Sequence, residues 1–302
     1  MKIIFMGTPS YAKEILEEIL NNPKMEVVAV YTQPDKPVGR KMILTPPPVK
    51  ELAEKYNIPV FQPVKLRDTE VVKNLLSMAY DYIVVAAYGQ ILPKAILEHA
   101  PCINLHASIL PAYRGASPIQ QTLLSNDTKT GVTAMLMDVG LDTGAILKIS
   151  EIDVSSTEMA EPLFDKLTKT ATKLIIDVLE NFANFAPINQ DDTKATHCTK
   201  ITKNDGLIDF LDAQNIYNKY RAFTPWPGIF LENGLKLKEL ALCETTSENR
   251  QGVILEIKEN SIIVGCVKGS LEIFTLQAPS KKETDSTSYI RGKRLALADT
   301  LS

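Results

Sequence analysis

The first half of the chain alternates between two patterns of apolar and polar residues. Apolar runs such as 2–7 and 25–32 are typical of buried strands, whereas the apolar residues of 11–22 recur at helical spacing. Thr8 followed by Pro9 marks the expected start of that helix. The alternation continues through 48–57, 58–63, 69–79 and 81–89. Near-continuous apolar strands separated by helices indicate an α/β fold with a parallel sheet covered on both faces.

The second half of the chain changes pattern. A strand at 131–139 and a helical pattern from about 157 to 182 complete the first domain, after which periodicity weakens in a polar stretch. One short helix and several short strand candidates with regular turns follow, which suggests a small β-barrel or sandwich, OB-like in type. We therefore expect a first domain at 1–189, a linker at 190–206 and a second domain at 207–302.

Composition narrows the class of protein. The 302 residues are 45% hydrophobic and 23% charged, as in soluble globular proteins. A net charge of −3 gives no global argument for nucleic acid or an anionic membrane, so any nucleic acid must use local basic patches. The four cysteines lack the spacing of a zinc site, so we expect them to be reduced, as in a cytoplasmic protein. The sequence also shows no signal-peptide pattern and no long apolar run, so we expect a protein that does not enter a membrane.

The strand candidate CINLH at 102–106 carries two demanding polar side chains. Successive strand residues point to opposite faces, so Asn104 and His106 share one face while Ile103 and Leu105 share the other. Satisfied polar groups in a core would explain them, but ligands of such sheets bind at the carboxyl ends of the strands, where this pair is expected. That position favours a functional role.

The turn DVGLDTG at 138–144 offers a carboxylate, from Asp138 or Asp142, that could join this pair. A solvated turn is the plain alternative. A carboxylate beside an imidazole would stabilise its protonated form, and an amide N–H could stabilise an oxyanion. Asparagine, histidine and aspartate together suit acyl transfer to an amine without a covalent enzyme intermediate.

Other chemistries find less support in the sequence. Cys102 is expected to be a buried structural thiol, and Ser108 lacks the GxSxG elbow. The three histidines show no metal-ligand spacing, and FMGTP has a single glycine where a dinucleotide fingerprint needs three. We expect no metal.

The stretch QPDKPVGRKMILTPPPVK at 33–50 is rich in proline and basic residues. It reads as a long, mobile surface loop stiffened at its far end, and such a loop above the active edge of the sheet would suit a phosphodiester partner. A second basic stretch lies at 279–294. Two basic patches on two domains could hold one extended nucleic acid.

INLHASILPAYRGASPIQ, followed by GVTAMLMDVGLDTG, is similar to the signature of the folate-dependent formyltransferases. MGTP, TQPDKPVGR, VVAAYGQILPK and RAFTPWPG resemble the members of that family that act on tRNA, and the similarity runs from Met1 to about Leu297. The resemblance implies a Rossmann-like formyltransferase domain with a parallel sheet at 1–189, followed by a small OB-like, tRNA-binding β-barrel domain at 207–302.

The resemblance also implies a reaction: the formyl group of 10-formyltetrahydrofolate passes to the amino group of methionine on initiator methionyl-tRNA, for translation initiation. The implied catalytic residues are Asn104, His106 and Asp142, and Arg40 and Lys41 would bind tRNA. Beside the 138–142 turn, the implied folate site comprises Ser108, Ile109, Leu110, Pro111, Tyr88, Gly89, Gln90, Ile91 and Leu92. We expect a monomer.

The sequence departs from the family in one telling place. Met42, Ile43 and Leu44 stand where the family typically carries more glycine and lysine, so phosphate contacts beside Arg40 are expected to be weaker or shifted. The alternative within the family is a formyltransferase acting on an amino-sugar nucleotide or glycinamide ribonucleotide, against which the basic loop and the second domain argue. A nucleic-acid-binding module with an inactive first domain is the alternative outside it, against which the intact trio argues.

Overall fold

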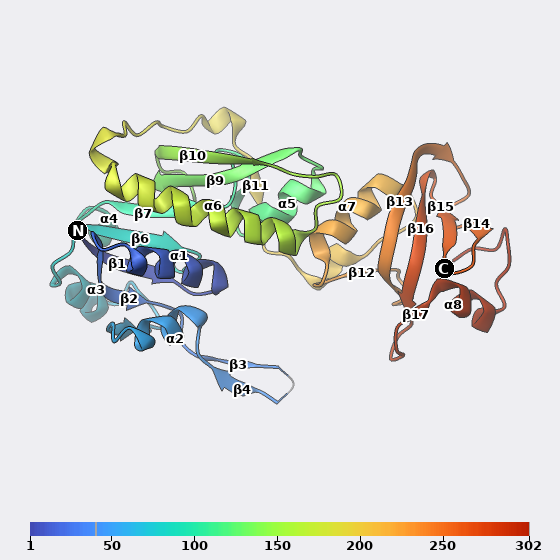
Figure 1. Ribbon diagram of the computed structural model, residues 1–302, viewed down its shortest axis with the longest axis horizontal. Helices are drawn as coiled ribbons and strands as arrows, with labels where there is room; N and C mark the ends of the chain where they lie inside the picture. Colours follow the sequence, from blue (N-terminus) through green and yellow to red (C-terminus); the bar gives the residue numbers. More distant parts are fainter. Residues whose placement is uncertain (40, 302) are drawn as a thin grey trace. The chain divides into compact units, whose positions relative to one another are not determined.

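The structure is a computed structural model that describes residues 1–39 and 41–301. The chain forms two compact units, shown as ribbons in Figure 1. The first unit comprises Met1–Pro118, Lys129–Asp153 and Phe164–Cys198; the second comprises Ile119–Thr128, Val154–Leu163 and Thr199–Ser302. Two short segments from the middle of the chain therefore pack with the carboxyl-terminal residues.

The first unit contains a sheet of order β10-β9-β7-β6-β1-β2-β5. Neighbouring strands from β7 to β5 run parallel, whereas β9 is antiparallel to both β7 and β10. The α/β fold expected from the alternating pattern is confirmed, with an antiparallel edge added to the parallel sheet. The strands are β1 (Lys2–Gly7), β2 (Glu26–Tyr31), β5 (Val60–Phe61), β6 (Tyr82–Ala86), β7 (Cys102–His106), β9 (Lys129–Leu136) and β10 (Ile146–Asp153).

Helices cover this sheet on both faces. Consecutive residues Ile3, Ile4 and Phe5 of β1 are all fully buried, which requires cover on each face of the strand. The helices of this unit are α1 (Ser10–Asn21), α2 (Pro48–Lys55), α3 (Thr69–Leu76), α4 (Lys94–Leu97) and most of α6 (Ala160–Glu180), whereas α5 (Pro118–Leu124) falls almost wholly in the second unit. The first helix begins at Ser10, and Thr8 does not cap it: the Thr8 hydroxyl donates instead to the backbone oxygen of Tyr88, at 3.1 Å.

The basic stretch at 33–50 is a β-hairpin rather than an irregular loop. β3 (Lys36–Val38) pairs antiparallel with β4 (Ile43–Thr45). The carboxylate of Asp35 anchors the hairpin at its base, because it accepts from Lys50 Nζ at 2.9 Å and from Gln62 Nε2 at 2.7 Å. Arg40 lies outside the described residues.

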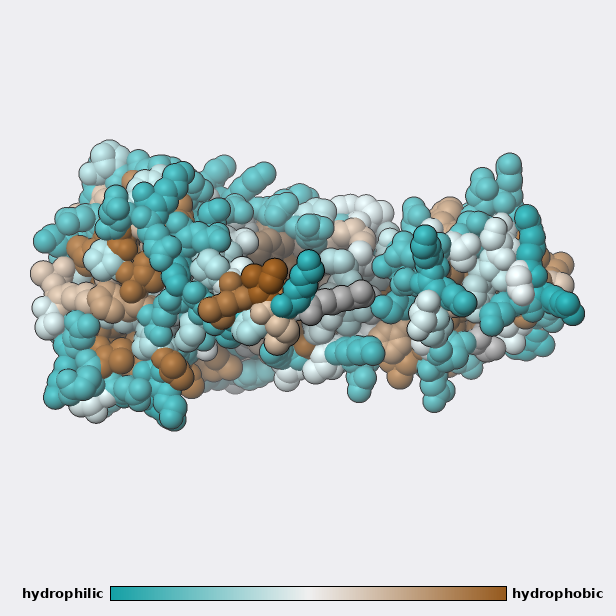
Figure 2. All heavy atoms as spheres, turned by 90° about the horizontal axis from the view of Figure 1, so that it is seen from below, coloured by the Kyte–Doolittle hydropathy of each residue, from teal (hydrophilic) through white to brown (hydrophobic). Residues whose placement is uncertain are grey.

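The far end of this hairpin is apolar and exposed. Figure 2 shows brown spheres gathered over it, and Val38, Met42, Ile43 and Leu44 are each more than half exposed. Lys41 beside them is also exposed. An exposed apolar group of this kind, bordered by charge, is typical of a surface that contacts a partner.

Residues 190–206, for which the sequence predicts a linker, carry short ordered elements. β11 (His197–Cys198) pairs in parallel with β8 (Arg114–Gly115), which ties this stretch to the first unit. From Thr199 onward the chain belongs to the second unit. The 3-10 helices around it are η1 (Phe182–Asn184), η2 (Asp192–Lys194) and η3 (Lys203–Gly206).

The second unit is built on antiparallel strands, as expected. Its sheet has the order β12-β13-β16-β15-β14, and β17 pairs with β16. The strands are β12 (Ile229–Phe230), β13 (Lys236–Glu248), β14 (Ile254–Ile257), β15 (Ile262–Gly265), β16 (Lys268–Gln277) and β17 (Thr284–Asp285). The helices are α7 (Ala213–Phe223), which Asp212 caps, and α8 (Ser286–Lys293), which Asp285 caps.

A buried arginine joins α7 to the segment 119–128. Arg221 is 1% exposed, and its Nη2 donates to the backbone oxygen of Leu123 and to Oδ1 of both Asn126 and Asn218. Burial lowers the pKa of this guanidinium, and the three acceptors offset part of that cost. In the residues that the structure describes, no helix is both long and apolar enough to cross a membrane.

Candidate active site

The pair Asn104 and His106 lies on β7, between two strands of different direction. β6 runs parallel to β7, and β9 runs antiparallel, with Asn104 opposite Met135 and His106 opposite Thr133. Ile103 is fully buried, and Leu105 is nearly so. The two apolar residues thus hold the strand in the sheet while the two polar residues face the same neighbour.

That neighbour is Asp142. Its Oδ1 lies 3.5 Å from Nδ2 of Asn104, and its Oδ2 lies 3.7 Å from Nδ1 of His106. The backbone N–H of Gly115 donates to the same Oδ2 at 2.9 Å. The histidine and aspartate side chains are 7% and 12% exposed. Because these side chains are largely removed from water, the electrostatic attraction between the Asp142 carboxylate and its polar neighbours is stronger than it would be in solvent.

The other carboxylate of the turn has a local role. Asp138 Oδ1 accepts from the hydroxyl of Thr143 at 2.6 Å and from the backbone N–H of Gly140 at 3.0 Å. These contacts shape the turn on which Asp142 lies. Of the two carboxylates in this turn, Asp142 is the one that contacts the polar pair.

The hydrogen on the imidazole of His106 can be placed. Its Nε2 lies 2.9 Å from the backbone oxygen of Tyr113. A carbonyl oxygen only accepts, so Nε2 must carry the hydrogen in this contact. The other ring nitrogen, Nδ1, faces Asp142.

The turn that carries Asp142 reaches the site from an unexpected direction. Because β9 is antiparallel to β7, its last residue, Leu136, lies opposite Ile103, near the amino end of β7. The turn therefore starts at the amino end of β7 and folds back over the face that carries Asn104 and His106. Asp142 has a φ of +55°, in the left-handed region. The rule that places ligand sites at the carboxyl ends of parallel strands does not account for this member of the trio.

Gln190 holds this turn in place, and sequence reasoning missed it. Its Nε2 donates to the backbone oxygens of Asp142 and Gly144, each at 2.8 Å, and its Oε1 accepts from Nε and Nη2 of Arg114, at 3.0 and 2.8 Å. Arg114 is 4% exposed and also binds Asp192 Oδ1 at 2.7 Å. A lone glutamine in a polar stretch without periodicity carries no local signal that could have revealed this role.

The loop after β7 folds on itself. Ser108 donates from Oγ to the backbone oxygen of Ala112 at 2.6 Å, and Thr133 Oγ1 bridges the Ser108 oxygen and the Leu110 N–H. Ser108 and Leu110 are buried. Their side chains therefore support the loop, and any ligand contact from them would come through the backbone or from Ile109 and Pro111, which are partly exposed.

A glycine is needed where this loop ends. Gly115 has a φ of +120°, and a Cβ there would lie 2.1 Å from the backbone oxygen of Cys198. No other residue fits that position without moving β11. The N–H of Gly115 that contacts Asp142 is thus held by a backbone that tolerates only glycine.

The other segment of the implied folate site follows β6, the strand beside β7. Tyr88 and Leu92 are buried, and the side chain of Gln90 accepts from the backbone N–H of Leu66 and donates to the oxygen of Pro63. Ile91, by contrast, is 82% exposed. In this segment, which also includes Gly89 at a φ of +83°, the Ile91 side chain is exposed and Gln90 is partly buried.

Cys102 does not have the properties of a nucleophile. Burial raises the pKa of its thiol to about 12, so the reactive thiolate is scarce at neutral pH. Within residues 1–39 and 41–301, no three His, Cys, Asp or Glu side chains form a group that could hold a metal ion.

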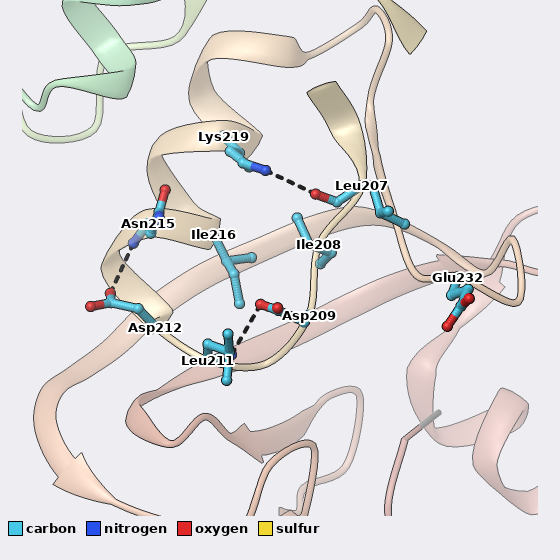
Figure 3. A pocket seen from close by; sticks show the side chains of 9 residues that line it. All are labelled: Leu207, Ile208, Asp209, Leu211, Asp212, Asn215, Ile216, Lys219 and Glu232. Carbon is cyan, nitrogen blue, oxygen red and sulfur yellow. Dashed lines mark hydrogen bonds between the residues drawn. The ribbon is translucent and has the colours of Figure 1, made fainter. Parts of the chain in front are cut away.

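A separate pocket belongs to the second unit and contains none of these residues. It has a volume of about 570 Å³, and Figure 3 shows its lining. Its polar groups already serve the fold: Lys219 donates to the oxygen of Leu207, Asp209 accepts from the N–H of Leu211, and Asp212 caps α7. The lining residues are Leu207, Ile208, Asp209, Leu211, Asp212, Asn215, Ile216, Lys219 and Glu232.

A doubly covered sheet with an Asn–His–Asp group on its face, followed by a small antiparallel β unit, is the architecture of a formyltransferase. Residues 1–179 match the formyl transferase family, and residues 200–294 match the formyl transferase C-terminal domain. The chain belongs to this family. It is 65% identical to the methionyl-tRNA formyltransferase of Sulfurimonas denitrificans over 302 residues, which cover 100% of both chains. It is 59% identical to that of Nitratiruptor sp. and 51% identical to that of Campylobacter jejuni, with 99% of each chain covered.

Solved structures share the fold at low identity. The N-formyltransferase of Helicobacter canadensis, in complex with folinic acid and dTDP-3-aminofucose, has a TM-score of 0.69 at 19% identity, covering 91% of this chain and 98% of that one. HypX from Aquifex aeolicus in complex with tetrahydrofolic acid has a TM-score of 0.60 at 14% identity, covering 98% and 48%. Because both identities are low, these likenesses concern the fold alone.

Proposed function

We propose that this protein transfers the formyl group of 10-formyltetrahydrofolate to the free amino group of methionine on initiator methionyl-tRNA, and so supplies N-formylmethionyl-tRNA for translation initiation. The observation that carries the proposal is the full-length likeness to methionyl-tRNA formyltransferases, at 65% and 59% identity. The family likeness covers residues 1–179 and 200–294, so it extends to the carboxyl-terminal region as well as to the amino-terminal one.

An amino-sugar nucleotide is a weaker candidate for the acceptor. The sugar N-formyltransferases that resemble this chain are 19% and 20% identical to it, a level that speaks for a common fold and not for a common acceptor. Glycinamide ribonucleotide, the other alternative, finds no support among these relatives.

The reaction joins the amine nitrogen of methionine to the formyl carbon and breaks the bond between that carbon and N10 of the folate. The amine gives up one proton, and N10 receives one. A tetrahedral adduct with a negatively charged oxygen lies between the two steps. The site must therefore accept a proton and stabilise an oxyanion.

His106 is our candidate for the proton transfer. Its Nε2–H is engaged by the backbone of Tyr113, so its Nδ1, on the side of Asp142, is the atom that takes the proton. General base catalysis of this kind contributes about 10²–10⁴-fold in rate. The carboxylate of Asp142 would orient the ring and stabilise the charge that forms on it.

Asn104 is our candidate for the oxyanion donor. Its Nδ2 carries two hydrogens, and one of them points to Asp142 Oδ1 at 3.5 Å. The second would serve the oxygen of the tetrahedral adduct. Asp142 would thereby orient both the base and the donor, and the reacting carbon would lie beside all three side chains.

The two substrates would approach from different elements. The backbone after β6 (88–92) and after β7 (108–111) fits the pterin of the folate, since both segments follow neighbouring parallel strands. Arg40, Lys41 and the second domain (207–302) would bind tRNA. A cytoplasmic monomer is the form in which we propose that the protein acts.

Selective formylation tests the proposal. The purified protein is incubated with 10-formyltetrahydrofolate and, in parallel, with charged initiator tRNA, charged elongator tRNA and a dTDP-amino sugar. Formylation of the initiator alone is expected. Preferential formylation of the amino sugar, or no discrimination between the two tRNAs, would refute the proposed acceptor.

A further inference from the structure

Two loops meet at Asp142, and one side chain joins them. The first loop is 113–115, whose backbone contacts His106 through Tyr113 and Asp142 through Gly115. The second is the turn 138–144, which carries Asp142. Gln190, which belongs to neither, binds Arg114 of the first loop and the backbone of the second.

The contacts of Gln190 use its whole amide group. Both hydrogens of Nε2 serve backbone oxygens, those of Asp142 and Gly144, and Oε1 accepts twice from the guanidinium of Arg114. The amide can face only one way, because the carbonyl oxygens require a donor and the guanidinium requires an acceptor. Gln190 thus links the guanidinium of Arg114 to the backbone oxygens of Asp142 and Gly144 through its amide group.

The chain around Gln190 reinforces this clamp. Ile188 and Ile146 exchange backbone hydrogen bonds of 2.8 and 2.9 Å, which pair the segment before Gln190 with the first residue of β10. Arg114 is itself held by Asp192. Residues 188–190 therefore fix the end of the turn that leads into β10. Asp142 itself has a φ of +55°, a backbone conformation that persists only where neighbouring contacts hold it.

We infer that Gln190 is a positioning residue for formyl transfer, which holds Asp142 against His106 and Asn104 by donating to the backbone of the turn. The inference rests on the proposed function and extends it to a residue outside the trio. Gln190 touches no reacting atom. Loss of its two donated hydrogen bonds frees the turn, and misplacement of a reacting group by about 1 Å can cost about 10²-fold in rate.

Gln190→Met is the variant to test, because it keeps the length of the side chain and removes every hydrogen bond. We expect kcat to fall at least tenfold while the KM for initiator methionyl-tRNA stays within about twofold. Gln121→Met is the matched control: Gln121 is also partly buried, and its amide donates to Ser125 Oγ, four residues further along the chain. The control should retain wild-type turnover.

A double-mutant cycle separates positioning from general support of the fold. If Gln190 acts through Asp142, Gln190→Met should cost less than about threefold in an Asp142→Asn background, because coupled residues are not additive. Losses that multiply would overturn the inference. The inference would also be overturned if Gln190→Met kept the wild-type kcat per folded molecule, whether or not its melting temperature fell.

Two further measurements complete the test. If Gln190→Met fails to fold, Gln190→Glu keeps the contact with Arg114 but turns an oxygen toward the two carbonyl oxygens, and it should lose turnover to the same degree; wild-type turnover would overturn the inference. The imidazole ¹⁵N signals of His106, assigned with His106→Ala, should shift in Gln190→Met and not in the control. Unchanged signals would refute the positioning role even if the wild-type protein proved to formylate a different acceptor.

Discussion

Asp142 Oδ2 lies 3.7 Å from Nδ1 of His106, in a site where neither side chain is more than 12% exposed. The same carboxylate group also contacts Asn104 and the backbone of Gly115. A single carboxylate therefore contacts both polar side chains of β7. The expected effects of substitutions at these residues follow from these contacts.

His106→Ala and Asp142→Asn should each lower turnover at least tenfold while the fold stays intact. The first variant removes the proton acceptor, and the second removes the charge that orients it. Steady-state formylation of initiator methionyl-tRNA measures the loss, and circular dichroism melting reports on folding. His99→Ala, at an exposed histidine that packs on Tyr80, is the matched control and should be fully active. Near-normal turnover in either test variant would contradict the assignment.

Asn104→Ala should lower kcat by about 10²–10³-fold, because a donor to the oxyanion is lost from a site shielded from water. Asn104 contacts Asp142 at 3.5 Å, a long hydrogen bond, so its removal should disturb the His106–Asp142 pair little. The KM for the folate should change by less than about threefold. A variant that loses affinity but keeps kcat would assign Asn104 to binding instead.

Arg40→Ala and Lys41→Ala should raise the KM for initiator methionyl-tRNA and leave the KM for 10-formyltetrahydrofolate unchanged. Lost contacts to phosphate should also make the KM for tRNA less sensitive to salt. Lys73→Ala, on the exposed surface of α3, removes a charge of the same sign and is the control. An unchanged KM for tRNA in both hairpin variants would remove the hairpin from tRNA binding.

Asp35→Asn should weaken tRNA binding without touching the trio, because the ion pair with Lys50 anchors the base of the hairpin. Hydrogen bonds from Gln62 and Lys50 lower the pKa of the Asp35 carboxyl. A lowered pKa means that the anchor is intact above the ordinary range of an aspartate and is lost only as pH falls through the depressed value. We expect a higher KM for tRNA at neutral pH and faster protease cleavage within 36–45. Wild-type values for both would show that the hairpin needs no anchor.

Asp285 should make the stability of the second unit depend on acid pH. The N–H of Ser288 and the hydroxyl of Thr287 donate to its carboxylate and lower its pKa to about 2. Since an unfolded aspartate titrates near about 3.9, the contribution is complete above about pH 4 and disappears between about pH 4 and 2. Asp285→Ala should cost about 1 kcal/mol at pH 7, as loss of a helix cap does. Thermal unfolding at pH 7 and pH 3 measures it; a cost that does not shrink at pH 3 would argue against this ionised cap.

The elements of the fold were largely predictable because their signals are local. The apolar runs at 2–7 and 81–89 became β1 and β6, and the helical pattern at 212–223 became α7. Thr8 was a different case: its residue type suits a helix cap, yet its hydroxyl found the backbone oxygen of Tyr88. The residue type determines which hydrogen bonds a side chain can form, whereas the packing of the fold determines which partner lies within reach.

The hairpin at 36–45 shows the same limit on a larger scale. Proline and basic residues predicted a mobile loop, but the ion pair of Asp35 with Lys50 and the contact with Gln62 close its base, and the chain between forms β3 and β4. These partners lie far apart in the sequence, so no local pattern contained them.

The sequence alone determined that Asn104 and His106 share one face of a buried strand, because side chains of a strand alternate with a period of two. It also determined the family, through long motifs in a fixed order. The tertiary structure alone decided that β9 runs antiparallel to β7, that the turn carrying Asp142 starts at the amino end of β7, and that Gln190 donates to the backbone of this turn. The physical reason is that strand direction and the satisfaction of backbone oxygens depend on contacts between residues distant in the chain, which periodicity does not encode.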